Sequence, residues 1–145
     1  MREQFAVEGK TAIITGASQG IGRSIAERFA DDGADVVICS REQENVDEVA
    51  EGINAEDGGE CLAIECDVTD RDAVDSLVEA TVEEFGGVDI LVNNAGASFM
   101  ANFEGISENG WKTIVDINLT GTYHCIQAAE EHLKESSGSG INLSS

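Results

Sequence analysis

Hydrophobic residues recur along this chain in two alternating patterns, short apolar runs and longer amphipathic stretches. The short runs have the length of buried β-strands, and several are rich in β-branched residues. The longer stretches repeat their apolar residues at helical spacing, so the pattern predicts strands that alternate with helices. The expected strands are Ala12–Thr15, Val36–Cys39, Cys61–Ile64, Ile90–Val92 and Ile141–Leu143.

Four amphipathic helices are expected between these strands, each with an apolar stripe and a recognisable end. Ile21, Ile25 and Phe29 form the first stripe, and Gly33 is expected to end that helix. The second stripe consists of Val46, Val49, Ala50 and Ile53, and Gly58–Gly59 follows that helix. The third helix has Thr69 or Asp70 as its cap and Gly86–Gly87 as its terminator, and its stripe consists of Val74, Leu77, Val78, Thr81 and Phe85. The fourth helix opens at Ser107, contains Trp111, Ile114, Val115, Leu119, Ile126 and Ala129, and ends before a turn at Ser136–Gly140.

Strands that each feed a helix predict an α/β fold with a doubly wound parallel sheet, because the crossover helices must cover both faces. No repeat, low-complexity tract or linker divides the sequence. We therefore expect residues 1–145 to form a single Rossmann-type dinucleotide-binding domain that stops after its fifth strand. Ligands of such sheets bind at the carboxyl ends of the strands, so the residues that follow each strand are the candidate site.

A glycine-rich turn, Thr15–Gly22, follows the first strand. Gly16, Gly20 and Gly22 lack the Cβ atoms that would hold a phosphate away from backbone N–H groups, and Ile21 opens the helix behind them. Ser18 can add its hydroxyl, although it could equally be an ordinary loop or cap serine. The turn has no Gly-Lys-Ser/Thr and so is not a P-loop. A turn that only packs the helix on the sheet is the plainer interpretation.

Ser40 and Arg41 follow the second strand, where an NAD site carries a carboxylate for the ribose 2′-hydroxyl. The guanidinium of Arg41 suits a 2′-phosphate instead, so NADP is favoured over NAD as the cofactor. A solvated surface arginine is the alternative.

Polar residues also follow the third and fourth strands. Asp67 can accept a hydrogen bond from an adenine amino group while Val68 covers the ring, or Asp67 can simply begin a turn. After the fourth strand, amides that can tie neighbouring loops and small residues that admit a cofactor occur together: Asn93, Asn94, Ala95 and Gly96. These residues too could form only a turn.

Asn118 lies among apolar residues within the fourth expected helix. A buried asparagine without a hydrogen bond costs about 1–3 kcal/mol. Asn118 is therefore expected either to brace the helix or to serve a site.

The chain is strongly acidic, with 29 Asp and Glu residues against 8 Lys and Arg residues and a net charge of −21. This charge repels nucleic acid and anionic membranes, so neither is an expected partner. The acids are spread over helix faces and not gathered in a tail, which suggests a surface adapted to high salt and a halophilic source.

The amino terminus has no signal-peptide pattern, and no apolar run reaches the length of about 20 residues that spans a bilayer. Cys39, Cys61, Cys66 and Cys125 form no C-x-x-C pair, as expected for reduced core thiols in a cytoplasmic protein. Strand periodicity points Cys61 and Cys66 to opposite faces, so no metal site is expected.

These motifs, in order and spacing, resemble successive signatures of the classical short-chain dehydrogenases/reductases: Thr15–Gly22, Asp67–Val68, Asn93–Gly96, Asp116–Gly121 and Ile141–Ser145. The resemblance covers essentially the whole chain. It implies an oxidoreductase that transfers hydride between a nicotinamide cofactor and a carbonyl or alcohol substrate. Flavodoxin-like and GTP-binding domains fit less well, because their phosphate-loop and base-recognition motifs are missing.

The same resemblance implies a catalytic tetrad of Asn, Ser, Tyr and Lys. Asn118 matches the asparagine that holds a proton-relay water, and Ser145, in preference to its neighbour Ser144, matches the serine that bonds the reacting carbonyl. The family places a Tyr-x-x-x-Lys pair about a dozen residues further on, beyond these 145 residues. The sole tyrosine, Tyr123, is followed four positions later by Gln127. Very poor turnover by these residues alone is therefore expected.

Two hypotheses follow: the amino-terminal part of an NADPH-dependent reductase, or an inactive nucleotide-binding remnant of such a gene. Arg41 carries the NADP preference alone, since Gln19 stands where a basic residue is common in NADP-preferring members. Phe99, Met100 and Phe103 suggest an apolar lip for a small carbonyl substrate, and Gly96–Gly121 leans toward acyl thioesters. The family also implies a homo-oligomer for a full-length chain.

Overall fold

A parallel five-stranded sheet forms the centre of the computed structural model, which describes residues 7–94, 108–109, 112 and 116–142. The strand order is β3-β2-β1-β4-β5. The strands are β1 (Thr11–Thr15), β2 (Asp35–Ser40), β3 (Cys61–Glu65), β4 (Ile90–Asn93) and β5 (Ser139–Asn142). All five expected strands are confirmed. β5 begins two residues earlier than expected and includes Gly140, and Leu143 lies outside the described residues.

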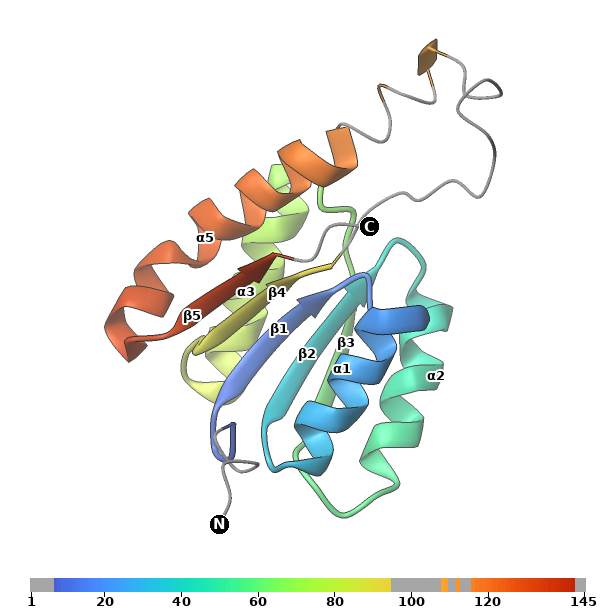
Figure 1. Cartoon of the computed structure of the whole chain (residues 1–145), viewed down its shortest axis with the longest axis vertical. Helices are drawn as coiled ribbons and strands as arrows, with labels where there is room; N and C mark the ends of the chain where they lie inside the picture. The colour runs from blue at the N-terminus through green and yellow to red at the C-terminus, as the bar shows by residue number, and fades with distance from the viewer. Residues whose placement is uncertain (1–6, 95–107, 110–111, 113–115, 143–145) are drawn as a thin grey trace.

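Helices cover both faces of the sheet, which confirms the doubly wound arrangement. Figure 1 shows α1 (Gly20–Asp31) and α2 (Gln43–Asn54) on one face, with α3 (Arg71–Phe85) and α5 (Gly121–Ser136) on the other. The chain moves outward from β1 to β2 and β3, then returns to β4 on the other side of β1. The order therefore reverses between β1 and β4, which makes their carboxyl ends the switch point where ligands bind in such sheets.

Two apolar layers hold the helices on the sheet, because alternate residues of a strand point to opposite faces. Ile14 and Ile38 pack under α1 and α2, whereas Ile13 and Val37 pack under α3 and α5. The predicted stripes of α2 and α3 are confirmed in these layers. Cys61 lies in the first layer and Cys66 in the second, as periodicity predicted.

Polar caps and glycines fix the helix ends. Asp70 is the N-cap of α3, and its Oδ1 accepts hydrogen bonds from the backbone N–H groups of Asp72 and Ala73 at 3.1 and 3.4 Å. Gly86 ends α3 with a left-handed φ of 90°. Gly33 follows α1 with a φ of 97°, so both predicted glycine stops are confirmed.

The predicted stripe of α1 is wrong at Ile21, whose side chain is 67% exposed. Small residues face the sheet instead, namely Gly22, Ala26 and Ala30, and Ile25 and Phe29 are only partly buried. Small side chains allow α1 to pack closely on the strands. Ile21 is left at the solvent-facing start of the helix.

The fourth predicted helix is interrupted by a wider π-helical turn, η3 (Asp116–Thr120), and α5 begins directly after it and continues to Ser136. Hydrogen bonds in a π turn span five residues, so the turn rotates the helix face relative to a regular α-helix. Leu119, within this turn, is 68% exposed, and on α5 Ile126 is 40% exposed whereas Ala129 is buried. The prediction that all three share a buried stripe is wrong.

The beginning of that predicted helix, with Ser107, Trp111, Ile114 and Val115, lies outside the described residues. Within the described ranges, no helix combines the length and apolarity needed to cross a bilayer.

Candidate functional site

The carboxyl ends of four neighbouring strands meet at one edge of the sheet. Thr15 of β1 is in register with Cys39 of β2, and Ser40 is in register with Glu65 of β3. On the other side of β1, Ile14 is in register with Val92 of β4. The loops that begin after these strands are therefore neighbours in space.

The glycine turn is held against the end of β2. The backbone N–H groups of Gly16 and Ala17 donate to the carbonyl oxygen of Cys39 at 3.0 and 3.2 Å. Gly16 and Gly20 have left-handed φ angles of 65° and 61°, which residues other than glycine rarely adopt. These two N–H groups are used internally, so the groups available to a ligand lie further on, at the start of α1.

Gly22 lets the loop after β4 approach the glycine turn. A Cβ atom at Gly22 would lie 2.3 Å from Nδ2 of Asn94 and 2.5 Å from the carbonyl oxygen of Gly16. Asn94 Nδ2 donates to that oxygen at 3.0 Å, and the Asn94 backbone N–H donates to Thr15 Oγ1 at 3.0 Å. Asn94 therefore ties the two loops together, as its amide predicted.

The amino terminus of α1 faces this edge without a side-chain cap. Its N-cap residue, Gln19, makes no capping hydrogen bond, and its first turn contains no acidic residue. By contrast, α3 is capped by Asp70, and α2 has Glu44 in its first turn. In so acidic a chain, the first turn of α1 keeps its partial positive charge and its N–H donors for a ligand.

Ser40 and Arg41 form the turn from β2 into α2. The Ser40 hydroxyl donates to the carbonyl oxygen of Glu42 at 2.9 Å and accepts from the Glu42 N–H at 3.3 Å, so it shapes the turn. The side chain of Arg41 is exposed beside the edge. Its charge acts on Asp67, which follows the neighbouring strand.

Asp67 is an exposed, ionised carboxylate at the end of β3. Its Oδ1 accepts from the hydroxyl of Thr69 at 2.7 Å and from the Thr69 N–H at 3.0 Å. These two bonds, and then the charge of Arg41, lower the pKa of Asp67 below its ordinary value of 3.8.

Val68 is 5% exposed and packs against the start of α5. A Cβ atom at Gly121 would lie 2.5 Å from Val68 Cγ2. Nδ1 of His124 lies 2.9 Å from the Val68 carbonyl oxygen, and because a carbonyl only accepts, Nδ1 carries the hydrogen. Sequence reasoning did not predict these contacts. The glycine in Asn-Leu-Thr-Gly was a usable signal, but nothing near His124 in the sequence indicated its partner.

Of the remaining predicted site residues, the structure describes only some. Ser18 is half-buried in the glycine turn, and Asn118 is half-buried on η3, which contacts α5. Ala95, Gly96 and Ser145 lie outside the described residues. The part of the chain that the structure describes contains no cluster of three side chains that could bind a metal ion.

Two thiols lie just beneath the edge, one on each of the neighbouring strand ends. The thiol of Cys39 donates a hydrogen bond to Cys66, which raises the pKa of Cys39 well above its ordinary 9.0 and lowers that of Cys66. Both side chains are buried, as are Cys61 and Cys125, and all four are free thiols.

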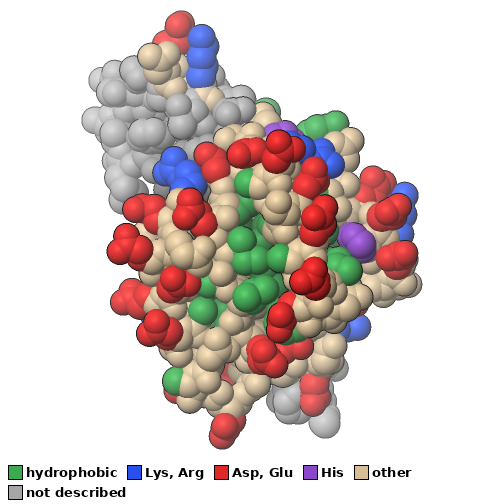
Figure 2. All heavy atoms as spheres, turned by 180° about the vertical axis from the view of Figure 1, so that it is seen from behind, with side chains coloured by type: hydrophobic (Ala, Val, Ile, Leu, Met, Phe, Trp, Pro, Cys, Tyr) green, Lys and Arg blue, Asp and Glu red, His purple; other side chains and the backbone are tan. Residues whose placement is uncertain are grey.

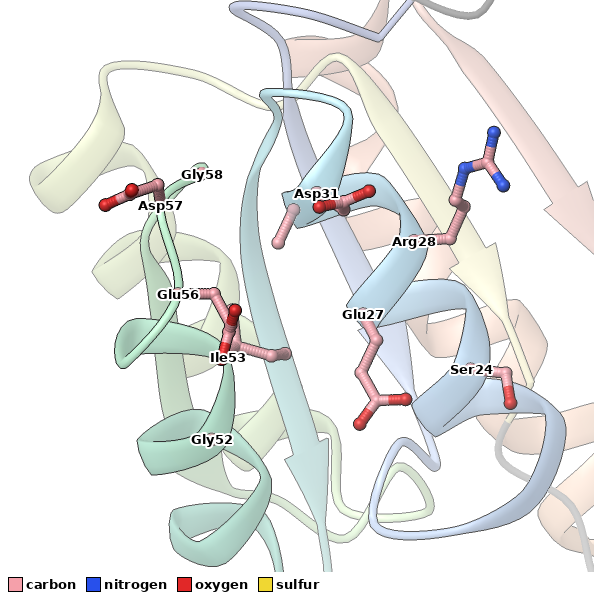
Figure 3. A pocket seen from close by; sticks show the side chains of 10 residues that line it. Ser24, Glu27, Arg28, Asp31, Gly52, Ile53, Glu56, Asp57 and Gly58 are labelled. Carbon is pink, nitrogen blue, oxygen red and sulfur yellow. The ribbon is translucent and has the colours of Figure 1, made fainter.

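A hollow of about 500 Å³ lies elsewhere, between α1 and α2 (Figure 3). Its walls carry Glu27, Asp31, Glu56 and Asp57, with Arg28. Most of these residues belong to the C-terminal halves of the two helices and the turn after α2, away from the glycine turn. The uncapped start of α1, the glycine turn and Arg41 make the carboxyl edge of the sheet a better candidate than this hollow for a ligand-binding site.

A doubly wound parallel sheet with a glycine turn after its first strand defines the Rossmann class of folds. Within that class, residues 10–145 match the family model described as short chain dehydrogenase. The chain belongs to this family of oxidoreductases.

Relatives agree with this assignment. The chain is 44% identical over 140 residues to an uncharacterized oxidoreductase of Methylorubrum extorquens, covering 96% of this chain and 56% of that one. It is 41% identical to the 3-oxoacyl-acyl-carrier-protein reductase FabG of Staphylococcus aureus, covering 94% of this chain and 56% of that one.

A solved structure is similar in fold as well as sequence. The alcohol dehydrogenase from the archaeon Thermococcus sibiricus, complexed with 5-hydroxy-NADP, superposes with a TM-score of 0.85 and 32% identity, over 92% of this chain and 57% of that one. The chain thus spans just over half the length of the relatives it matches.

Proposed function

We propose that this protein is an NADPH-dependent oxidoreductase that acts on a small carbonyl or alcohol substrate, with the cofactor bound at the carboxyl edge of β1–β4. NADPH supplies a hydride when bound. The fit of the site to a dinucleotide rests on the uncapped start of α1 and on Gly20, where no atom lies within 4 Å of the place of a Cβ. Gly22 supports the site indirectly, because it lets Asn94 tie the neighbouring loop to the glycine turn. Gly16, Ser18, Gly20, Ile21 and Gly22 would surround the pyrophosphate.

Arg41 carries the preference for NADPH. It stands at the end of β2, where a carboxylate would bind the ribose 2′-hydroxyl of NAD, and its exposed guanidinium can bind a 2′-phosphate. The Ser40 hydroxyl, already bonded to Glu42, would hold the turn that presents Arg41. The alcohol dehydrogenase of Thermococcus sibiricus was solved with an NADP analogue, which supports the same choice here.

Asp67 and the loop after β4 would hold the rest of the cofactor. Thr69 occupies Oδ1 of Asp67, which leaves Oδ2 to accept from the adenine amino group. Asn94, Ala95 and Gly96 would line the path toward the nicotinamide. In this arrangement the ionised state of Asp67 is the one that accepts, in keeping with its lowered pKa.

Catalysis would use Asn118 to hold a relay water and Ser145 to hydrogen-bond the substrate carbonyl. Hydride addition to a carbonyl leaves an alkoxide that needs a proton, and a positioned donor contributes about 10²–10⁴-fold. Tyr123 is a poor donor, because its side chain is 58% exposed on α5 and Gln127 replaces the lysine partner. The coding DNA beyond Ser145 tests this step: a Tyr-x-x-x-Lys supports the reductase, and a genuine stop supports a nucleotide-binding remnant.

The substrate class and the assembly are proposals of the same kind. Similarity to a 3-oxoacyl-acyl-carrier-protein reductase supports an acyl thioester as the carbonyl substrate. Tyr123 and Ile126 expose 58% and 40% of their area and, three residues apart, lie along one side of α5, while Leu119 on the adjoining η3 is 68% exposed. We propose that this side meets a second copy in a homo-oligomer, and that the protein acts in the cytoplasm, where its thiols stay reduced.

Titration with NADPH and NADH in multimolar KCl tests the cofactor proposal. We expect NADPH to bind at least about tenfold more tightly, because Arg41 adds charge-assisted hydrogen bonds. Arg41→Ala should weaken NADPH binding by about ten- to a hundredfold and leave NADH binding unchanged.

Arg28→Ala is the matched control for this titration. It removes the same charge from the far end of α1, where Arg28 pairs with Asp32 at 2.9 Å. Equal affinities of the unmodified protein for NADPH and NADH, or normal NADPH binding by Arg41→Ala, would refute the role of Arg41.

A further inference from the structure

One face of α5 contacts and hydrogen-bonds the segment that follows β3. Gly121 lies against the side chain of Val68, His124 bonds its carbonyl oxygen, and the Gln127 amide oxygen accepts from Nη1 of Arg71. The three α5 residues are spaced by three, which places them on one side of the helix. We name Gly121, His124 and Gln127 the α5 clasp.

The clasp holds the segment on which the proposed adenine contact depends. Asp67 directly precedes Val68, and its Oδ1 is fixed by Thr69 directly after it. The position of the Asp67 carboxylate therefore follows the position of the Val68 peptide. Arg71 extends the same connection, since its Nε also donates to Asp75 of α3 at 2.9 Å.

We propose that His124 is a positioning residue for the adenine half of the cofactor, acting through the Val68 carbonyl; this rests on the cofactor site proposed above. Packing alone does not require a histidine here, because Gly121 already fits Val68 and Val68 is already buried. What His124 adds is a donor for a partly buried carbonyl oxygen, 56 residues away in sequence. Without that donor the oxygen would lose a hydrogen bond. The Val68–Thr69 peptide would keep its bond from the Thr69 N–H to Asp67 Oδ1 at 3.0 Å but lose the one at its carbonyl.

A pair of isosteric variants separates the hydrogen bond from the packing. His124→Asn keeps a donor nitrogen at the δ position. The side chain introduced by His124→Leu is branched like that of asparagine and similar to it in size, but it has no donor. Leucine also has the higher helix propensity, so a defect of the leucine variant cannot come from a weaker helix. His132→Leu makes the same change two turns further along α5, where His132 faces Glu135 at 3.6 Å.

The readout compares three probes: NADPH, adenosine 2′,5′-bisphosphate, which is only the adenine half, and reduced nicotinamide mononucleotide, which lacks it. We expect His124→Leu to weaken the binding of NADPH and of adenosine 2′,5′-bisphosphate by about three- to tenfold. Binding of the mononucleotide should not change. His124→Asn and His132→Leu should bind all three as the unmodified protein does. Circular dichroism and the urea midpoint check that each variant is folded.

Gln127→Leu provides a second arm should His124→Leu fail to fold, because Gln127 is on the exposed side of the clasp. It should weaken the two adenine-containing probes by a smaller factor and spare the mononucleotide. The proposal is overturned if the folded clasp variants bind every probe normally, or if the mononucleotide weakens by the same factor as NADPH. If the unmodified protein binds neither NADPH nor NADH, the cofactor site itself fails, and the role of His124 fails with it.

Discussion

The four cysteines have different acidities because their surroundings differ. Burial raises the pKa of Cys61 to about 12, and burial together with the nearby Cys66 raises that of Cys125 to about 12. Cys66 accepts a hydrogen bond from the thiol of Cys39, which stabilises its thiolate and lowers its pKa below the ordinary 9.0. Cys39, as the donor, is correspondingly harder to ionise.

Among the thiols of the folded protein, Cys66 should be the first that iodoacetamide modifies at pH 8, and slowly, because only 3% of it is exposed. The thiolate is the reactive form, and at this pH a group with a lowered pKa holds far more of it than a group whose pKa is about 12. Cys39, Cys61 and Cys125 should react only after unfolding. Mass spectrometry of tryptic peptides gives the order, and labelling in urea, where all four should react alike, is the control. Modification of Cys61 or Cys125 as fast as Cys66 would contradict these acidities.

At the scale of elements, glycines within helices have opposite roles. Gly22, in the first turn of α1, faces Asn94 and the Gly16 carbonyl, and a methyl group there would clash with both. Gly52, near the end of α2, has no atom within 4 Å of the place where a Cβ would lie, and it has no left-handed φ. The first glycine is required by a close approach of two loops, and the second only adds freedom to the unfolded chain.

The same substitution at these two positions should change stability in opposite directions. Gly22→Ala should lower the free energy of unfolding by about 1–3 kcal/mol, because it overpacks the turn and displaces the Asn94 bond. Gly52→Ala should raise it by about 0.5–1 kcal/mol through better helix propensity and a less flexible unfolded state. Urea unfolding in constant KCl measures both. A destabilised Gly52→Ala, or a neutral Gly22→Ala, would show that the local packing differs from this description.

Predictions from the sequence succeeded where periodicity is regular and failed where backbone geometry changes it. The stripes of α2 and α3 are uninterrupted, so their buried residues follow directly from spacing. Leu119 was misplaced because it lies in η3, and a single sequence gives little sign of a π turn. Ile126 was misplaced because α5 packs through Gly121, Cys125 and Ala129. Ile21 was misplaced because hydrophobicity alone does not reveal that α1 packs through its small residues.

In the candidate site, too, the sequence could place some residues and not others. Arg41 follows β2 directly and Asp67 follows β3 after one residue, so their place at the carboxyl edge could be predicted, because parallel strands bring these ends together. The contact of His124 with Val68 joins segments 56 residues apart, and it depends on how α5 docks against the sheet. Sequence spacing carries no information on that docking.

On the scale of the whole molecule, like charge is the dominant surface property. Figure 2 shows Asp and Glu side chains spread over the face seen from behind, with few Lys or Arg among them. Several of the cations are already paired within their own helix, as in Arg23 with Glu27 at 3.1 Å and Arg71 with Asp75 at 2.9 Å. These paired cations are already counted in the net charge of −21, so the excess of acidic side chains remains unbalanced.

Stability should accordingly rise with salt. Charges interact over about 10 Å in 0.1 M salt but only about 3 Å in 1 M salt, so concentrated KCl relieves the self-repulsion of the folded state. We expect the urea midpoint to increase clearly between 0.1 M and 3 M KCl, in keeping with a halophilic source. Sucrose, an uncharged stabiliser, is the control that separates screening from general exclusion. A midpoint that KCl does not move would contradict both the repulsion and the proposed source.

The bond from Asn94 to the Gly16 carbonyl also sets an order of events during synthesis. The two residues are 78 positions apart, so the glycine turn emerges from the ribosome long before the side chain that ties it down. At translation rates of about 5–20 residues per second, the interval is about 4–16 s. During that time β1 and β2 can pair, but the turn between β1 and α1 lacks its partner on the β4 side. The glycine turn of a nascent chain therefore gains this bond only after β4 has joined the sheet, and the proposed cofactor site is incomplete until then.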